Sequence, residues 1–401
     1  MRSPLLNTPG AVPALAPDDS VAAHYGDPYA EQRALLQGTA LVDRSNRDVL
    51  RVSGVDRLSW LNDLSSQKVD TLAPGTDTQT LILDPQGRVE HHLTLVDDGD
   101  ATWIHVEPGT GTELATYLEK MRFMLRVEIT DLTAEYAVVS TAPTAAPSAA
   151  SAAGPSKGSA AGPSAGLAAV PSAEPTAGSS AGTNAASDAS PGVVALRALA
   201  ERTPGAVVIG TDLLVPRPAL ATVITRPAGL WAYDALRIEA HRPRLGFDTD
   251  HKTIPHEVGW IDSAVHLTKG CYRGQETVAR VHNLGHPPRR LVFLHLDGSV
   301  DTLPPHGTPV TLGVSTPAEG DPTASIEGAT EGTATPGQIG FIGSSARHHE
   351  LGPIALAVVK RTVPVDIPLL AGNVAATQEV IVPPDAGRNV TIDPALRRRL
   401  R

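Results

Sequence analysis

The chain has 401 residues, which is enough for two or three domains and a sizeable core. Its formal net charge of −10 argues against a broad nucleic-acid-binding surface, and its one cysteine excludes an intrachain disulfide and any self-contained zinc or iron–sulfur site built from several thiolates. The sequence has no run of about 18 apolar residues that could span a membrane and no N-terminal apolar stretch of signal-peptide length, so we expect a cytoplasmic protein with no membrane contact and no direct nucleic-acid contact.

Residues 1–27 are rich in proline and alanine without a clear period, and we interpret them as a loose lead-in. Residues 28–140 form the expected N-terminal α+β part. Within it the apolar pattern gives the order strand, helix, two or three strands, helix, strand, which fits a ferredoxin-like unit. A turn at Asp84–Gly87 joins the strands expected at 78–83 and 89–96.

Residues 141–191 differ sharply from the sequence on either side. They are almost wholly Ala, Ser, Pro, Gly and Thr, and Lys157, Glu174 and Asp188 are their charged residues. Such a composition buries too little apolar surface to offset the conformational entropy of ordering the chain. We therefore predict a disordered linker, which needs no function of its own.

Residues 192–288 are predicted to be a second α+β part, with helices at 193–202 and 231–240. Residues 289–385 are predicted to be a small β-barrel, because short apolar runs alternate with Gly and Pro turns. The barrel strands are expected at 291–296, 308–312, 338–342, 354–360 and 379–382. Residues 386–401 are left as a tail.

One motif stands out in the second part. It consists of Lys269, Gly270, Cys271, Tyr272, Arg273, Gly274, Gln275 and Glu276. Lys269 and Arg273 place positive charge near the thiol, and such charge lowers a thiol pKa. The two glycines allow a tight turn or a close approach to a ligand. We interpret Cys271 as a candidate reactive thiol, while a buried structural cysteine is the alternative.

This motif resembles the signature of the YgfZ-type folate-binding proteins, which are relatives of the glycine-cleavage T-protein, an aminomethyltransferase. Neighbouring runs agree, including Arg237–Ala240, Arg242–Gly246 and Ile254–Glu257. The resemblance covers roughly residues 28–140 and 192–385. It implies T-protein-like α+β domains around a folate cleft, a small C-terminal barrel, and tetrahydrofolate as the cofactor.

The resemblance also implies folate-binding residues. Where the T-protein has two adjacent aspartates after its first hairpin turn, this chain has His91 and His92. On a strand they point to opposite faces, so we expect one to face the domain interior or cleft and the other to face solvent. Glu239 matches a glutamate that accepts hydrogen bonds from the pterin, in a run that begins at Arg237. Arg242 and Arg244 are candidates for binding the glutamate tail of folate. The alternative for Glu239 and the arginines is a solvated surface.

The histidines show no metal-ligand spacing, so we expect no metal site apart from Cys271 as a possible single ligand of a shared iron–sulfur cluster. The favoured hypothesis is a folate-binding accessory protein of iron–sulfur cluster assembly or repair, which indirectly supports tRNA-modifying iron–sulfur enzymes and has client or assembly proteins as partners. A tetrahydrofolate-dependent aminomethyl or one-carbon transferase is the alternative, against which His91 and His92 speak because imidazole and carboxylate carry different charges. A third hypothesis is a pure interaction scaffold whose folate pocket is a relic without a present role.

Overall fold

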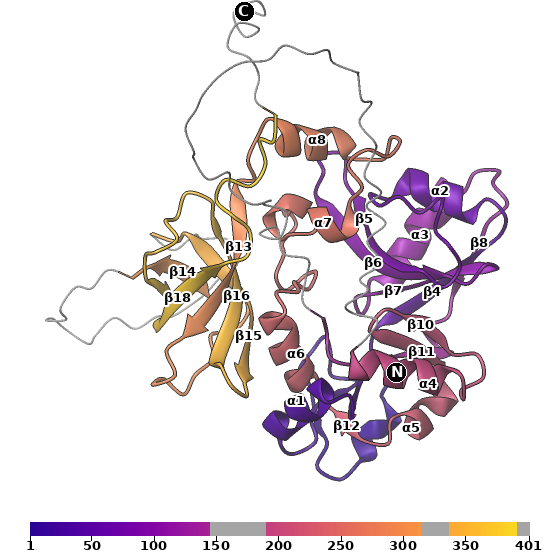
Figure 1. Ribbon diagram of the computed structural model, residues 1–401, viewed down its shortest axis with the longest axis horizontal. Helices are drawn as coiled ribbons and strands as arrows, with labels where there is room; N and C mark the ends of the chain where they lie inside the picture. The colour runs from indigo at the N-terminus through magenta and orange to yellow at the C-terminus, as the bar shows by residue number, and fades with distance from the viewer. Residues whose placement is uncertain (145–189, 314–336, 391–401) are drawn as a thin grey trace, which may run out of the picture.

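The computed structural model describes residues 1–144, 190–313 and 337–390. In these residues, two five-stranded sheets with flanking helices lie beside a closed barrel (Figure 1). Most of the predicted linker 141–191, the loop 314–336 and the end of the predicted tail lie outside the described residues. Within them, no helix is both long and apolar enough to cross a membrane.

The first sheet and its helices confirm the predicted order, with three strands where the sequence left two or three open. Its antiparallel strands, in spatial order, are β5 (Asp77–Leu83), β6 (Val89–Asp97), β7 (Ala101–Val106), β4 (Asp48–Ser53) and β8 (Glu128–Asp131). Helices α2 (Arg57–Leu64) and α3 (Gly111–Met121) cover one face, where Trp60, Leu114 and Leu118 join the core. The turn at 84–87 is where the sequence predicted it.

The second sheet is assembled from both sides of the segment 141–191. Its strands, in spatial order, are β10 (Val207–Ile209), β11 (Asp212–Pro216), β9 (Tyr136–Ser140), β3 (Leu41–Asp43) and β12 (Pro227–Ala228). Helices α4 (Pro191–Ala200) and α5 (Leu220–Val223) pack against this sheet, and the short η3 (Arg217–Ala219) comes just before α5 in the chain. The predicted division between 28–140 and 192–288 therefore does not separate the two sheets, because strand pairing here joins residues far apart in sequence.

The two sheets pack face to face through a small apolar layer. Val49, Val96 and Trp103 of the first sheet meet Val138 and Leu214 of the second. This packing leaves the β5–β6 edge of the first sheet facing the helices that lead to the barrel (Figure 1).

Residues 1–27 are not the loose lead-in that their composition predicted. They contain η1 (Pro4–Asn7), β1 (Val12–Pro13) and β2 (Ala22–His24), and β1 pairs with β2. Leu5 and Val21 are buried in the core, and Asp18 forms an ion pair with Arg244. Their order comes from docking onto the rest of the molecule, which apolar periodicity does not reveal.

Several further short helices pack against the sheets, the barrel or each other. They are α1 (Pro28–Leu36), α6 (Leu230–Glu239), η4 (Pro255–Glu257), α7 (Ile261–Ala264) and α8 (Gln275–Asn283). Helix α6 packs between α1 and the barrel strand β15, so it lies at the centre of the molecule (Figure 1).

The predicted C-terminal barrel is confirmed. Its strands, in order around the barrel, are β13 (Arg289–Leu296), β16 (Gly352–Lys360), β15 (Gly340–His348), β14 (Pro309–Leu312), β17 (Leu369–Ala371) and β18 (Val374–Val380). Val292 and Leu294 face the barrel interior, whereas Leu291 and Phe293 face the core shared with α6 and α8. Strand β17 was not predicted, and β18 begins five residues before the strand expected at 379–382 and ends at Val380, two residues before the expected end. In the predicted tail, the backbone N–H of Asn389 donates to the carbonyl of His282 (3.0 Å).

Candidate functional site

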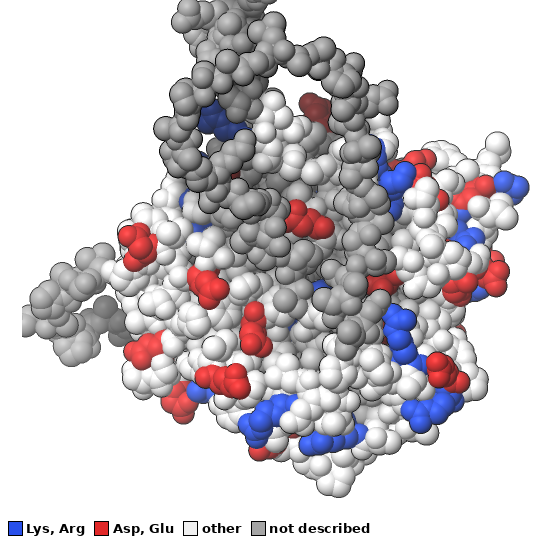
Figure 2. Space-filling view, in the orientation of Figure 1, with Lys and Arg blue, Asp and Glu red and all other residues white. Residues whose placement is uncertain are grey.

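A cavity of about 2080 Å³ lies where the β5–β6 hairpin, helix α6 and the edge of the barrel meet. Its lining includes His92 from β6, Tyr233 and Asp234 from α6, Arg242 after α6, and Trp260. Outside the cavity, on the face that Figure 2 shows, acidic and basic side chains both occur among the described residues and no basic field covers the surface. The cavity is therefore the feature that best fits a ligand site.

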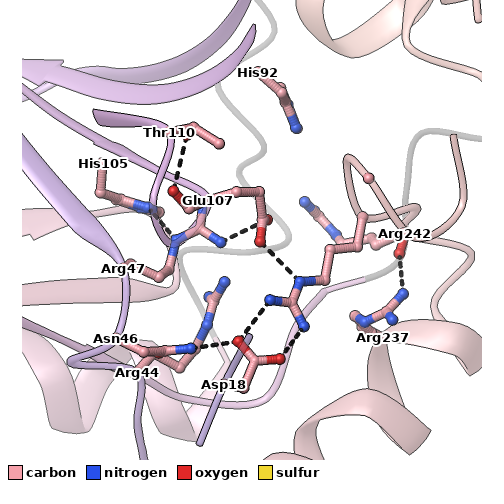
Figure 3. Close-up of polar contacts among 12 residues, drawn as sticks. Asp18, Arg44, Asn46, Arg47, His92, His105, Glu107, Thr110, Arg237 and Arg242 are labelled. Atoms are coloured by element: carbon pink, nitrogen blue, oxygen red, sulfur yellow. Dashed lines mark hydrogen bonds and ion pairs between the residues drawn. The ribbon is translucent and has the colours of Figure 1, made fainter. Parts of the chain in front are cut away.

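One wall of the cavity is a network of buried charges (Figure 3). Arg47 donates to His105 Nδ1 (2.9 Å) and to Glu107 Oε1 (2.7 Å), and Arg244 donates to Glu107 Oε2 (2.8 Å). Burial alone would raise the pKa of the Glu107 carboxyl, but Arg47 and Arg244 hold it below its usual value. The protein's own contacts therefore hold Arg47, Glu107 and Arg244 in place in this part of the wall.

The network continues to the second sheet. Arg44 Nη1 donates to the hydroxyl of Tyr233 (2.9 Å), and Asp212 Oδ2 lies 3.0 Å from His105 Nε2. Burial lowers the pKa of His105 to about 4, so this imidazole is neutral at pH 7. These contacts fix Tyr233 in place on the cavity surface.

Arg237 and Arg244, which were predicted to bind folate, are already paired within the protein. Arg244 donates to Asp18 through Nη1 (2.7 Å) and Nη2 (2.8 Å), in addition to Glu107. Arg237 donates to Asp234 (2.6 Å) and to Asp248 (2.9 Å). Because the protein's own carboxylates engage both guanidinium groups, the structure gives both arginines a structural role in the cavity wall.

Glu239 does not lie among the residues that line the cavity. It is at the C-terminal end of α6, and its Oε2 lies 3.1 Å from Nε2 of the buried His348 on the barrel strand β15. The backbone N–H groups of Glu350 and Leu351 donate to His348 Nδ1, so Nε2 is the nitrogen that donates to Glu239. Glu239 therefore links α6 to the barrel, and its role as a pterin acceptor stays a prediction.

Asp234 presents a carboxylate to the cavity from the same helix. Its Oδ1 accepts from Arg237 Nε (2.6 Å), and the side chain is about 27% exposed. Residues 230, 233, 234 and 237 share the cavity face of α6, as helical spacing requires, and His241 lines the cavity just after the helix. Asp234 therefore offers the cavity a carboxylate that can accept hydrogen bonds, which is the property that the sequence analysis assigned to Glu239.

His91 and His92 point to opposite faces of β6. His92 lines the cavity, where its ring lies 4.5 Å from the ring of Trp260, centroid to centroid. His91 is buried on the helix-covered face, and burial lowers its pKa. The structure thus brings only His92 to the cavity, and it places His91 in the interior rather than in solvent.

Arg242 differs from the other cavity arginines. Its guanidinium donates to the carbonyl (2.5 Å) and the hydroxyl (2.9 Å) of Thr144. Among the described residues it has no carboxylate partner within ion-pair distance. Burial lowers its pKa, and an anionic ligand group would offset the cost of keeping this charge half-buried.

The motif around Cys271 lies outside the cavity lining. Lys269 is buried, and its Nζ donates to the carbonyls of Asn62, Ser65 (2.6 Å) and Gln67 (3.0 Å), which follow or end α2. Burial lowers the pKa of Lys269 to about 8. The ammonium therefore holds the loop after α2, which is a structural task that the sequence reading did not foresee.

The remaining motif residues dock the loop onto the β5–β6 hairpin. Arg273 forms an ion pair with Glu90 on β6 (3.0 Å), Tyr272 is buried, and Gln275 Nε2 donates to the carbonyls of Lys269 and Gly270 (both 3.3 Å). Gly274 has φ +83° and caps the N-terminus of α8, whose first turn contains Glu276. Cys271 is exposed. Both cations expected beside its sulfur therefore have partners elsewhere.

Sequence reasoning missed Tyr233, Asp234 and Trp260. The first two could have been found from the helical spacing of polar residues before Arg237, since residues three and four apart share a face. Trp260 lies in a short turn where no period signals its direction. Among the residues that the structure describes, no group of three or more His, Cys, Asp or Glu side chains is arranged to hold a metal ion.

Comparison with known proteins agrees with the fold. The family model for the N-terminal domain of GCVT matches residues 23–151. The crystal structure of the glycine cleavage system aminomethyltransferase T from Bartonella henselae superposes on this chain with a TM-score of 0.64 at 15% sequence identity. The match covers 96% of this chain and 98% of that one.

Curated relatives match over shorter lengths. A chloroplastic protein of Arabidopsis thaliana named as a putative transferase is 25% identical over 287 residues, which is 70% of this chain and 61% of the relative. The aminomethyltransferase of Synechococcus elongatus is 33% identical over 131 residues, 29% of this chain and 34% of that protein. The chain thus spans less than two thirds of the curated relatives it matches. It has the fold of the glycine-cleavage aminomethyltransferase, and its N-terminal third resembles that superfamily in sequence.

Proposed function

We propose that the central cavity binds tetrahydrofolate and that the protein is a folate-binding accessory factor of the YgfZ type, which supports iron–sulfur cluster assembly or repair. The observation that carries the folate proposal is that two side chains line the same cavity: the carboxylate of Asp234, which Arg237 orients, and the guanidinium of Arg242, which has no carboxylate partner among the described residues. A pterin presents adjacent N–H donors, and its glutamate tail is anionic, so these two side chains match its two ends.

The cavity walls fit the ring system as well. Trp260 and Tyr233 provide aromatic surface, and ligand pockets are commonly lined by such groups with a few placed polar atoms. The volume of about 2080 Å³ exceeds that of a typical pocket for one small ligand. In this proposal Asp234 takes the pyrimidine edge and Arg242 the tail, while Arg237 orients Asp234.

The test is a calorimetric titration with tetrahydrofolate. Asp234→Asn should weaken binding about 10- to 100-fold, because it replaces a charge-assisted hydrogen bond. Glu239→Gln is the matched control on the same helix, and its affinity should stay within about twofold because Glu239 faces the barrel. If Glu239→Gln weakens binding while Asp234→Asn does not, the assignment of the pterin end is wrong.

The tail end has its own variant. Arg242→Ala should weaken binding of tetrahydrofolate more than binding of a tetrahydropterin that lacks the glutamate tail. Arg226→Ala, at an exposed arginine hydrogen-bonded to Thr39, is the control. An equal loss for both ligands would remove Arg242 from the tail site.

The iron–sulfur part of the proposal is supported by the motif resemblance and by the exposure of Cys271 on a loop docked beside the hairpin. An exposed thiol is available to a partner protein, whereas a buried one is not. In cells that lack the native protein, Cys271→Ser should fail to restore iron–sulfur enzyme activities although the purified variant folds and binds tetrahydrofolate. Full restoration would refute the role of the thiol.

The aminomethyltransferase relatives favour a second candidate, a tetrahydrofolate-dependent transferase. Against it, the hairpin strand offers His91 and His92 where the T-protein has aspartates, and burial lowers the pKa of His92 to about 3. The imidazole of His92 is therefore neutral at pH 7, whereas a carboxylate at the same position would be negatively charged. Measured turnover of tetrahydrofolate to its methylene form with an aminomethyl donor would decide for the transferase.

A further inference from the structure

The ring of His92 is held in one orientation and one tautomer. Its Nε2 lies 3.1 Å from Gln79 Oε1 on the neighbouring strand β5, and its face lies against Trp260. An amide oxygen only accepts hydrogen bonds, so Nε2 must carry the proton. Nδ1 is then left with a lone pair and no hydrogen.

This lone pair faces the cavity. His92 lines the cavity and is directed into the open space opposite Arg242 (Figure 3). Its Nδ1 has no hydrogen-bond partner among the described residues, and it is not one of their buried unpaired atoms, so it is accessible to a ligand. Burial, with Arg47 adding to the effect, lowers the pKa of His92 to about 3, and the ring stays neutral at pH 7.

We propose that Nδ1 of His92 accepts a hydrogen bond from the N5–H or N10–H group of the bound folate, and that this contact makes the cavity selective for tetrahydrofolate over folates that carry a one-carbon substituent. The inference rests on the proposed function, since it names which form of folate the site prefers. It assigns His92 as a specificity-determining residue.

The chemistry of the ligand supports this selectivity. With the pyrimidine edge at Asp234, the remaining N–H donors of tetrahydrofolate include N5 and N10, which are the atoms that carry the one-carbon unit in loaded folates. Substitution there removes the donor and adds bulk, so an acceptor in the wall is left unpaired. A neutral imidazole accepts such a bond without the negative charge that a carboxylate would bring to the same place. The site therefore holds folate that has no one-carbon unit.

The experiment compares three ligands under reducing conditions: tetrahydrofolate, 5-methyltetrahydrofolate and 10-formyltetrahydrofolate. The wild-type protein should bind tetrahydrofolate at least tenfold more tightly than one of the two substituted forms. His92→Phe keeps a ring against Trp260 but removes the acceptor. This variant should lose about tenfold in affinity for tetrahydrofolate and should bind the three ligands alike.

Two further variants keep the test decisive. Gln79→Met leaves His92 in place without the partner that fixes its tautomer, and it should reduce the selectivity by about threefold even if His92→Phe folds poorly. Glu239→Gln, outside the cavity, should keep wild-type selectivity.

The possible failures are distinguishable. If tetrahydrofolate does not bind at all, the proposed function is wrong and the selectivity falls with it. If tetrahydrofolate binds but the wild type does not discriminate, or if His92→Phe discriminates as strongly as the wild type, the role of His92 is refuted while folate binding stands. If His92→Phe still discriminates, the shape of the cavity rather than His92 excludes the one-carbon substituent.

Discussion

The docking of the Cys271 loop on the hairpin depends on Gly274. This residue has φ +83°, and a Cβ atom built on it would lie 2.6 Å from the carbonyl oxygen of Asp84 and 3.0 Å from Cα of Gly87. Both neighbours are backbone atoms of the hairpin turn, which cannot move without shifting the turn. Gly274→Ala should therefore strain the local backbone and separate the loop from the hairpin.

The expected loss of stability follows from two effects. The left-handed conformation costs a residue with a Cβ about 1–2 kcal/mol, and an extra methyl group forced into a packed site costs about 1–3 kcal/mol. We therefore expect Gly274→Ala to lower the free energy of unfolding by about 2–5 kcal/mol, measured by urea denaturation.

The second motif glycine is a matched control. A Cβ on Gly270 would meet no heavy atom within 4 Å, and its φ lies outside the left-handed range. Gly270→Ala should change the free energy of unfolding by no more than about 0.5 kcal/mol. Equal losses for the two variants would refute the claim that close backbone approach, rather than loop flexibility, explains the glycines.

Two other contacts give predictions. Because the pKa of Lys269 is lowered from 10.5 to about 8, the unfolded chain holds a proton between these pH values that the folded chain has released. The free energy of unfolding of the wild type, relative to that of Lys269→Met, should therefore rise with pH across this window. Urea unfolding at pH 7.5 and pH 10 measures this change, and the opposite trend would mean that the folded state favours the ammonium form. Asp18→Ala leaves the largely buried side chain of Arg244 with Glu107 as its one remaining carboxylate partner among the described residues. The free energy of unfolding should therefore fall by about 3 kcal/mol. A loss below about 0.5 kcal/mol would mean that this contact of the N-terminal segment contributes little to stability.

The sequence predicted the hairpin and the barrel because their signals are local. The turn Asp84–Gly87 has Pro and Gly at turn positions, and the strands beside it are continuous runs of β-forming residues. Residues 1–27 lack such a signal, since their order depends on Asp18 meeting Arg244, a residue more than 200 positions away. Local patterns carry no information about such a contact.

The candidate site could be predicted only in part. Arg237 and Glu239 were placed together, but residues two apart on a helix point to different sides, and here one meets the cavity and the other the barrel. These different directions of the two side chains could have been expected from helical geometry. The roles of Lys269 and Arg273 could not have been read from spacing, because their partners come from α2 and β6.

These partners connect the thiol loop to the cavity. Arg273 pairs with Glu90, two residues before His92 on β6, and the turn of the same hairpin touches Gly274. A ligand held by His92 should restrain this strand and, through it, the loop that carries Cys271, provided that the loop has two arrangements with different affinities. Saturating tetrahydrofolate should then slow the alkylation of Cys271 by iodoacetamide at least about twofold, and Arg273→Ala should weaken that effect. Because coupling between sites is reciprocal, alkylated protein should also bind tetrahydrofolate with an affinity changed by a similar factor. An alkylation rate that does not respond to tetrahydrofolate, in protein shown to bind it, would mean that the cavity and the thiol act independently.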